Sequence, residues 1–431
     1  MLLAIIFIFL GLGCGLWYLL GDQKLRFDLL LASIWLIAIG VAQLHLSPLE
    51  RPWSLSFWLL LLSFSLVFGV AYNLGAKIWN KRLKNKEISI YLGSYFLFIL
   101  IFLTLLALVA NVYIFWRFGT LPLLSTIPDK MRFIINKEVF GPIEYAALLP
   151  RIYIPLSFLY LIINKSVKKL HLRLIIANIV LGLIFLLFYA SRLTIVITIL
   201  LCYFGYLAIK IKEISVKRIL TASFIAVSTI LLVSIAIPAM RQFITYRDYQ
   251  YAGEYNPFAY ISTISQVNLP PALQFLTPLY LIPTFNLQAL MRVTQFYGGA
   301  TFYGAYSLSV FNSLLEIARL PQLSAVIEWD KVFVPWWNTA TFIFGYFVDF
   351  GWIGTWLAAA LWGLGLAFIY VWNNKRPSLL TAFVLSYFSF VSIMTIYTNY
   401  FGREELYLDL ALIFLISILL RPKQKNLTSA S

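Results

Sequence analysis

Arg192 is the only charged residue between Leu174 and Ile209. A membrane-crossing helix needs roughly 20 residues, so this stretch is predicted to form two helices that turn at residues 190–192. Arg192 is then placed at the outer mouth of a helix bundle. There its planar fork of N–H donors would clamp a phosphate group; the alternative is an interfacial arginine that only reaches the lipid phosphates.

A second cation stands among carboxylates near the end of the chain. Arg403 is followed by Glu404 and Glu405, with Asp409 one helical turn further on. On the predicted topology this cation and these carboxylates lie at the same outer mouth of the bundle as Arg192. A local salt bridge between Arg403 and Glu404 would explain the pair without chemistry. Asp409 is expected to face a polar cavity, as acids inside membrane helices usually do.

Tyrosines alternate with ionic residues after residue 240. Arg241, Arg247, Asp248 and Tyr249 belong to this segment. Tyrosine rings stack on the apolar faces of sugars while their hydroxyls bond sugar hydroxyls, so the segment is predicted to bind sugars; tyrosines at a membrane interface have the same pattern. Arg292 is a further candidate for binding an anion.

The sequence predicts no metal site. The two histidines, His45 and His171, fall on opposite sides of the predicted membrane, so they cannot share a metal ion. Cys14 and Cys202 lie inside apolar runs, which is typical of buried thiols. His45 remains a candidate acid or base.

The composition places these residues in a membrane protein. Of 431 residues, 61% are hydrophobic and only 12% are charged, which excludes an ordinary soluble domain. Lipid offers no hydrogen-bond partner to an exposed backbone, and the apolar runs are too long for barrel strands, so the bundle is predicted to be all-α. The first run has no basic leader or small-residue cleavage site and is counted as a span rather than a signal peptide.

Eleven apolar runs are predicted to cross the membrane. They cover residues 2–20, 29–46, 54–76, 89–116, 143–163, 174–191, 193–209, 219–239, 341–372, 378–398 and 404–420. Pro150, Arg151 and Pro155 interrupt the fifth run. The ninth is long enough to begin outside the hydrocarbon.

The charges of the connections predict the orientation. One set of connections carries 20 of the 33 Lys and Arg residues but only four of the 17 acids, so the net charge of +16 lies on one side. Basic connections stay in the cytoplasm. The amino terminus is therefore predicted outside and the carboxyl terminus inside, and the basic balance indicates anionic lipid rather than nucleic acid.

The predicted organisation has four parts. Residues 1–239 hold the first eight spans, residues 240–340 form a large external loop with amphipathic helices, residues 341–420 hold the last three spans, and residues 421–431 form a cytoplasmic tail. A loop of that length is far beyond the usual connection and is expected to be functional.

The segment that opens the ninth span carries the most specific motif. Asn338 begins an N-T-x-T segment, and Tyr346 and Asp349 belong to a Y-x-x-D-F-G segment that ends at Gly351. This pattern, after a long external loop, resembles the O-antigen (Wzy-type) oligosaccharide repeat-unit polymerases. The preceding residues 302–308 are also similar, as are the placements of Arg192 and Arg403.

The resemblance implies a glycosyltransferase with a GT-C-like bundle and a large periplasmic loop in the bacterial inner membrane. It would transfer a growing glycan from undecaprenyl diphosphate to the next lipid-linked repeat, without metal, nucleotide or other cofactor. Arg192 and Arg403 would hold the lipid diphosphate, and Glu404, Asp349 or Asp248 would act as base. The implied partners are undecaprenyl-diphosphate-linked oligosaccharides, bilayer lipids, a chain-length regulator and a flippase, and no nucleic acid.

Two other functions share these features. A lipid-linked glycan ligase uses related chemistry but would be favoured by a histidine in the large loop, and residues 241–340 contain none. A lipid-oligosaccharide flippase would be expected to show internal repeats and ionisable residues along a path through the membrane. Neither feature is seen in the sequence.

Overall fold

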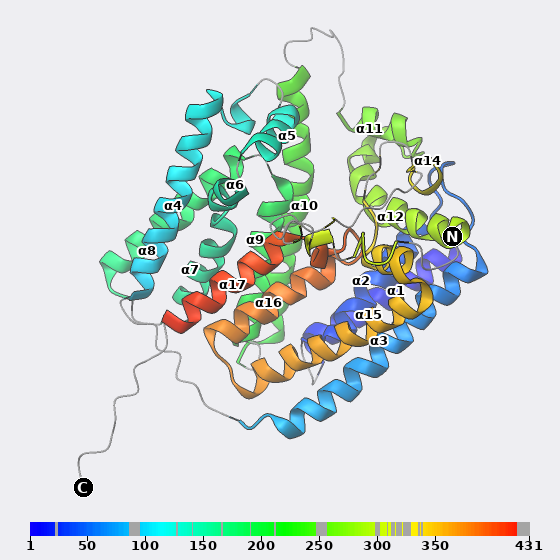
Figure 1. Ribbon diagram of the computed structural model, residues 1–431, viewed down its shortest axis with the longest axis horizontal. Coiled ribbons are helices and arrows are strands. Elements are labelled where there is room, and N and C mark those ends of the chain that lie inside the picture. The colour runs from blue at the N-terminus through cyan, green and yellow to red at the C-terminus, as the bar shows by residue number, and fades with distance from the viewer. Residues whose placement is uncertain are drawn as a thin grey trace. The chain divides into compact units, whose positions relative to one another are not determined.

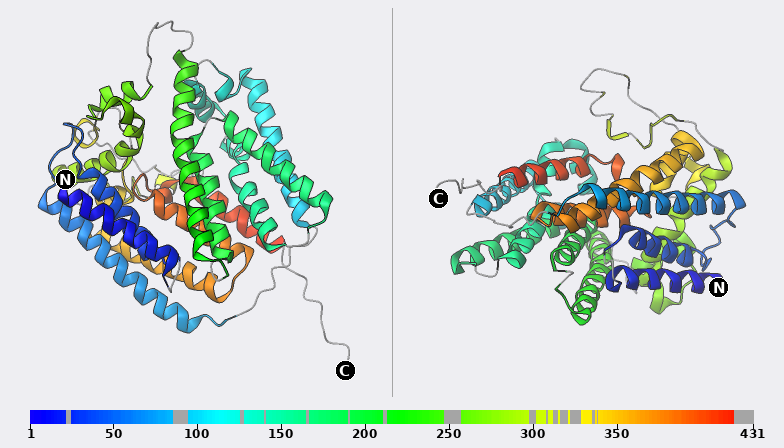
Figure 2. Two further views of the ribbon diagram at one scale, coloured as in Figure 1. Left: turned by 180° about the vertical axis from the view of Figure 1, so that it is seen from behind. Right: turned by 90° about the horizontal axis from the view of Figure 1, so that it is seen from below.

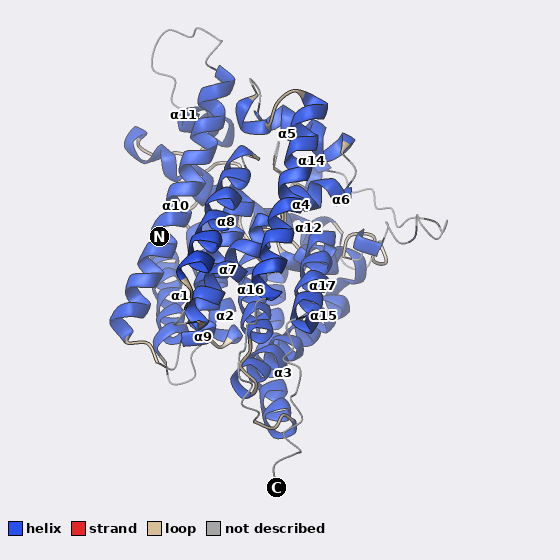
Figure 3. Ribbon diagram, turned by 90° about the vertical axis from the view of Figure 1, so that its left-hand side faces the viewer, coloured by secondary structure: helices blue, strands red, loops and turns tan. Residues whose placement is uncertain are grey.

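The computed structural model describes residues 1–21, 25–85, 95–125, 128–139, 141–164, 167–189, 191–210, 213–246, 257–297, 302–307, 309–311, 315, 321, 329–334, 337 and 339–419. Within these ranges the regular structure is helical, with no strand (Figure 3). The all-α prediction is therefore confirmed for the part of the chain that is described.

Among the residues that the structure describes, eight helical segments are long and apolar enough to cross a membrane. They are Leu2–Leu20, Leu55–Arg82, Tyr95–Leu124, Gly141–Ile163, Lys169–Phe188, Arg192–Lys210, Val216–Ile237 and Phe342–Lys375. The other three predicted spans correspond to helices of 16 residues each: α2 (Phe27–Ala42), α16 (Leu379–Met394) and α17 (Glu404–Leu419). The chain is thus a polytopic membrane protein by the length and composition of its helices.

The chain folds into two compact units, and each is built from segments that are far apart in sequence. The first comprises residues 1–85, 251–375 and 387–406. The second comprises residues 86–250, 376–386 and 407–431. Each unit has its own set of packed helices.

In the first unit, two pairs of long helices run side by side (Figures 1 and 2). Helix α3 (Leu55–Arg82) packs along α15 (Phe342–Lys375), and α1 (Leu2–Leu20) packs along α2. Small residues allow the close approach: a Cβ at Gly363 of α15 would lie only 2.7 Å from the Phe68 carbonyl oxygen of α3. The long apolar helices of this unit therefore pack closely against one another.

Shorter helices of the predicted loop cover the same unit. They are α11 (Pro257–Ser265), η2 (Pro271–Leu276), α12 (Thr277–Phe296), η3 (Ser309–Phe311) and α14 (Trp329–Val332). Helix α12 packs against α2 and carries Leu281 and Phe285 into a small core with Val334. Residues 257–265 and 277–296 of this predicted loop are helical, whereas most of the amphipathic stretch expected at 308–317 lies outside the described residues.

Gly351 breaks the regular geometry of α15. Its backbone angles are φ 64° and ψ −149°, a region that is essentially open only to glycine. The segment Phe342–Phe350 therefore leads into the long remainder of α15 through a kink. This kink explains physically why the glycine of the Y-x-x-D-F-G segment is needed.

The second unit is a bundle of the middle spans. It contains α4 (Tyr95–Phe118), η1 (Pro122–Leu124), α5 (Pro128–Glu138), α6 (Gly141–Ala147), α7 (Pro150–Ile163), α8 (Lys169–Phe188), α9 (Arg192–Lys210) and α10 (Val216–Tyr246). Helix α7 packs against α8 and α9, and α9 packs against α10. The predicted division of this stretch into two helices is confirmed, since α8 ends at Phe188 and α9 begins at Arg192.

Helix α10 continues past its predicted end. The apolar run predicts an end at residue 239, but α10 reaches Tyr246. The residues from 239 to 246 contain no glycine or proline that would end a helix. The first residues assigned to the large loop, including Arg241, are thus helical.

Candidate functional site

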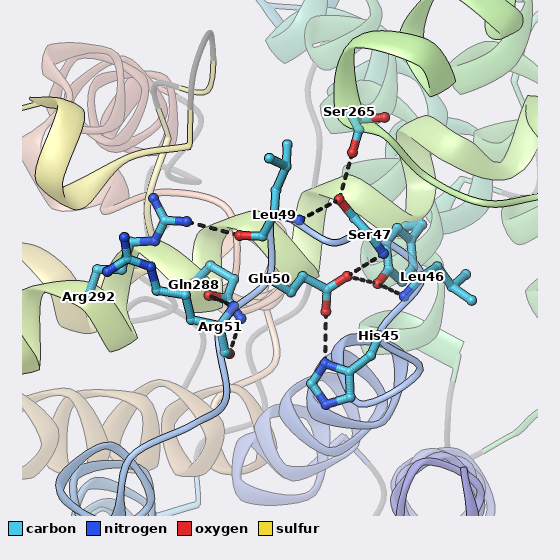
Figure 4. A network of polar contacts seen from close by, with 10 residues as sticks. His45, Leu46, Ser47, Leu49, Glu50, Arg51, Ser265, Gln288 and Arg292 are labelled. Carbon is cyan, nitrogen blue, oxygen red and sulfur yellow. Dashed lines mark hydrogen bonds and ion pairs between the residues drawn. The ribbon is translucent and has the colours of Figure 1, made fainter.

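A histidine and a buried glutamate pair in the connection between α2 and α3 (Figure 4). His45 Nδ1 lies 3.2 Å from Glu50 Oε2; the imidazole side chain is 47% exposed and the Glu50 side chain only 1%. The His45 backbone has φ 51°, a left-handed conformation that non-glycine residues seldom adopt. An exposed imidazole oriented by a carboxylate is the arrangement of a general base with its positioning group.

Tyr280 of α12 and the Ser47 backbone hold the carboxylate of Glu50. The Tyr280 hydroxyl donates to Glu50 Oε1, and the Ser47 N–H donates to the same oxygen at 3.0 Å. The Ser47 hydroxyl in turn donates to the Ser265 carbonyl at the end of α11 (2.6 Å). Burial raises the pKa of the Glu50 carboxyl, against the lowering effect of these hydrogen bonds. The dyad therefore links the α2–α3 connection to the helices of the predicted loop.

Two arginines flank this network on the same connection and on α12. The Arg51 side chain is exposed, and its guanidinium lies 5.9 Å from the centroid of the Phe296 ring. The Arg51 backbone exchanges two 3.0 Å hydrogen bonds with the Gln288 amide (Figure 4). Arg51 makes no ion pair with the described residues, so its charge is open to an external anion.

Arg292, predicted to bind an anion, is instead engaged with the backbone. It is 6% exposed, and its guanidinium donates to the Leu49 carbonyl at 3.0 Å (Figure 4). It also donates to the Phe333 carbonyl at 3.1 Å. Burial, and then the nearby charge of Arg51, lower the pKa of Arg292. These contacts give Arg292 a structural role in joining α12 to the α2–α3 connection.

Asp349 is fully buried and organises the segment 302–307. Its carboxylate accepts the Ser307 hydroxyl at 2.5 Å, the Ser307 N–H at 2.6 Å and the Tyr306 N–H at 3.2 Å. The two parts of the motif, about forty residues apart in sequence, thus form one contact. Lone pairs that already accept these donors are poorly placed to accept a substrate proton, so the geometry favours a structural role for Asp349 over a catalytic one.

We expect Asp349→Ala to lower the free energy of unfolding by about 3 kcal/mol, because it leaves buried donors without a charged acceptor. The measurement is thermal unfolding of the purified protein in detergent. Ser307→Ala removes a single hydroxyl and should cost about 1 kcal/mol. Equal midpoints for Asp349→Ala and the parent protein would contradict this assignment.

Arg403 stands just before α17, at the end of η4 (Tyr400–Gly402). Its guanidinium lies 5.5 Å from the centroid of the Tyr400 ring, and the side chain is half-buried. The simple salt bridge with Glu404 that the sequence allows does not form, and Arg403 has no carboxylate partner among the described residues. Glu404 is exposed. Arg403 is therefore a cation held against an aromatic ring.

Arg192 occupies the first turn of α9 in the second unit. The side chain is half-buried and makes no ion pair within the described ranges. The pair of Tyr189 and Glu144 is separate: the Tyr189 hydroxyl donates to Glu144 Oε1 at 3.1 Å. Arg192 and Arg403 belong to different units.

Asp409 does not face a polar cavity as expected. It is 1% exposed and forms an ion pair with Arg151 of α7, with Arg151 Nη2 3.0 Å from Asp409 Oδ1. The Tyr145 hydroxyl donates to the same oxygen at 2.9 Å. The charge that interrupts the fifth apolar run is therefore neutralised by an acid from α17.

Several predicted residues are not placed at a site. Arg247, Asp248, Tyr249 and Asn338 lie outside the described residues, as does the side chain of Arg241. Tyr346 is half-buried in α15, with its ring centroid 4.9 Å from that of Phe342. Among the described His, Cys, Asp and Glu residues, no group of three could hold a metal ion.

The sequence patterns do not single out Glu50 or Tyr280. The only local signal for Glu50 is an acid five residues after a histidine in a short connection between apolar runs. No pattern connects it to Tyr280, which is 230 residues away. Only the packing of α12 beside α2 brings them together.

The chain matches no protein-family model. A search of curated proteins and a search of solved structures also find no match. The function is therefore inferred from the residues and from the motif.

Proposed function

We propose that this protein is an integral-membrane glycosyltransferase that polymerises oligosaccharide repeat units carried on undecaprenyl diphosphate. The observation that carries the proposal is the state of its arginines. Arg26 and Arg151 are ion-paired with carboxylates, whereas Arg192 and Arg403 make no such pair with the described residues. Cations kept from carboxylates at helix ends suit an anionic substrate, and the motif around Asp349 supports a glycan polymerase.

The chemistry requires one bond to form and one to break. A hydroxyl oxygen of the acceptor sugar attacks the anomeric carbon of the donor glycan, and the bond from that carbon to the diphosphate oxygen breaks. The electron pair leaves with the lipid diphosphate, whose developing charge arginines can stabilise without a metal ion. The hydroxyl proton passes to a base.

We assign His45 as the candidate base, positioned by Glu50. His45 Nδ1 is turned toward the carboxylate, and Nε2 makes no hydrogen bond with the described residues. His45 takes the place of Asp349 as the candidate base, because the Asp349 oxygens already accept hydrogen bonds from backbone N–H groups and a hydroxyl. Glu404 remains the alternative base because it is exposed.

His45→Ala is expected to lower the polymerisation rate by about 10²–10⁴-fold, the usual contribution of a general base. Glu50→Gln should give a smaller loss with a changed pH profile, since the imidazole then lacks its orienting carboxylate. Both rates are measured with purified protein and lipid-linked repeats. His171→Ala, in a predicted cytoplasmic connection, is the matched control, and an unchanged His45→Ala rate would transfer the role to Glu404.

The proposed placement is the bacterial inner membrane, with eleven spans in a GT-C-like bundle, the amino terminus in the periplasm and the carboxyl terminus in the cytoplasm. It is supported by the contact between the connection 43–54 and α12. The charge pattern assigns both segments to the outer side, and segments in contact must share a side. The partners implied are the lipid-linked glycans, bilayer lipids, a flippase and a chain-length regulator.

One observation favours a second candidate, the lipid-linked glycan ligase. The predicted loop contains no histidine between residues 241 and 340, but the Glu50–Tyr280 hydrogen bond holds His45 beside α12 of that loop. A ligase would use the same base and the same lipid diphosphate. It would differ in its acceptor, which is not another lipid-linked repeat.

Deletion of the gene in its host separates the candidates. A gel of surface polysaccharide is run together with the lipid-linked intermediates. Single repeats at the surface without a ladder support polymerisation, and full-length polymer retained on undecaprenyl diphosphate supports ligation. Single repeats retained on the inner face would contradict both and indicate a flippase.

A further inference from the structure

A polar pocket lies at the end of α3 and α15 that is remote from the connection 43–54. Its volume is about 360 Å³, within the range of roughly 300–1,000 Å³ typical of small-molecule sites. It is lined by three cations and three asparagines: Arg26, Lys77, Lys375, Asn73, Asn80 and Asn374. Such a set of donors is suited to an anion.

Arg26 is held in place before any ligand arrives. Its Nε lies 3.0 Å from Asp28 Oδ1 and its Nη2 lies 2.5 Å from Asp28 Oδ2. The same Nη2 donates to the side-chain oxygen Oδ1 of Asn73 at 2.8 Å. The guanidinium also lies 5.7 Å from the centroid of the Tyr72 ring. The hydrogen bond to Asp28 raises the pKa of Arg26. The cation is thereby fixed and kept charged at the pocket wall.

The charge of the pocket is not neutralised by its own residues. Asp28 offsets Arg26, but Lys77 and Lys375 make no ion pair with the described residues, so two positive charges remain. A phosphate monoester carries three terminal acceptor oxygens and up to two negative charges, and a phosphodiester headgroup carries two terminal oxygens and one charge. Two ammonium groups with neighbouring amide donors suit either. Basic residues at a cytoplasmic helix end are common, but that tendency does not require asparagines around a concave pocket.

We propose that this pocket binds a phosphate group, carried either by the headgroup of an anionic lipid or by a soluble phosphate compound. Lys77 and Lys375 supply the charge, and Asn80 and Asn374 supply neutral donors. Phosphate binding here does not depend on glycan transfer, because the pocket lies at the other end of α3 and α15 from the His45–Glu50 dyad.

The test is native mass spectrometry of the full-length protein in detergent. Phosphatidylglycerol and phosphatidylcholine with identical acyl chains are compared, with inorganic phosphate as competitor. Lys77→Gln and Lys375→Gln should each weaken binding of phosphatidylglycerol about tenfold, as expected for loss of one charged hydrogen bond. Asn80→Ala should weaken it about threefold at unchanged net charge.

Lys81→Gln is the matched control. This substitution removes the same charge from the same helix, but Lys81 does not line the pocket. The variant should therefore bind phosphatidylglycerol within about twofold of the parent protein. Preference for phosphatidylglycerol assigns a lipid headgroup, whereas equal lipid binding with saturable inorganic phosphate assigns a soluble ligand. Unchanged binding in Lys77→Gln and Lys375→Gln, or an equal loss in Lys81→Gln, would overturn the proposal.

Discussion

Arg151→Met is expected to lower the free energy of unfolding by about 3–5 kcal/mol, the cost of removing one partner from a buried ion pair. Both side chains are almost fully buried, with exposed fractions of 5% for Arg151 and 1% for Asp409. The substitution leaves the Asp409 charge inside a helical bundle with Tyr145 as a hydroxyl donor. The midpoint of thermal unfolding in detergent measures the loss.

The double variant Arg151→Met/Asp409→Leu provides the control. Replacing both ions by apolar residues of similar size is often neutral, so most of the stability should return. Tyr145→Phe removes one hydrogen bond and should cost about 1 kcal/mol. A double variant less stable than Arg151→Met would contradict the account of a buried pair whose charges neutralise each other.

The second large effect is expected on activity. Arg403→Ala and Arg192→Ala should each lower glycan polymerisation by about 10²–10³-fold, the typical loss when one preorganised donor to a developing anion is removed. Protein abundance should not change, since neither side chain makes an ion pair with the described residues. The measurement is the ladder of surface polysaccharide in a deletion host that carries each variant.

Arg117→Ala is the control for Arg403 and Arg192. Arg117 is an exposed arginine at the end of α4, in a connection predicted on the same side, and it contacts Tyr113. Its loss should leave the ladder unchanged. Arg403→Lys keeps the charge but loses the planar fork, so partial activity is expected. Normal ladders from both alanine variants would remove the arginines from the mechanism.

Hydrophobic run length predicts much of the helical structure. All eleven predicted runs contain helices, because roughly 20 apolar residues in lipid must satisfy their backbone hydrogen bonds internally. The break between helices before Arg192 follows from the length of the apolar stretch 174–209, which is too long for a single span. The end of α10 does not follow in this way: Pro238 and Arg241 stand beside the predicted boundary at residue 239, but the helix continues through both to Tyr246.

The side-chain partners cannot be predicted in the same way. Arg151 and Asp409 are 258 residues apart, and Glu50 and Tyr280 are 230 apart. Periodicity describes which face of a helix is apolar but not which helix lies against it. For this reason the sequence suggests a cavity for Asp409 and a ligand for Arg292, whereas Asp409 pairs with Arg151 and Arg292 binds backbone carbonyls.

The motif around Asp349 can be found in the sequence, but the structural role of its residues cannot. The residue types of the segment around Asp349 reveal the motif. Its structural role depends on Ser307 and Tyr306, whose backbone N–H groups donate to the Asp349 carboxylate. Gly351 is explained by a backbone conformation that other residues rarely adopt. A motif can therefore indicate a family resemblance through residues that shape the site rather than react in it.

The most direct test of glycan polymerisation uses the purified full-length protein in lipid vesicles with a single oligosaccharide repeat on undecaprenyl diphosphate. Products are separated by size, and released undecaprenyl diphosphate is quantified. We predict a ladder of lipid-linked oligomers, with one lipid diphosphate released for each linkage formed and no requirement for a nucleotide. Lipid-linked repeats that remain single, with no lipid diphosphate released, would contradict the proposed polymerase.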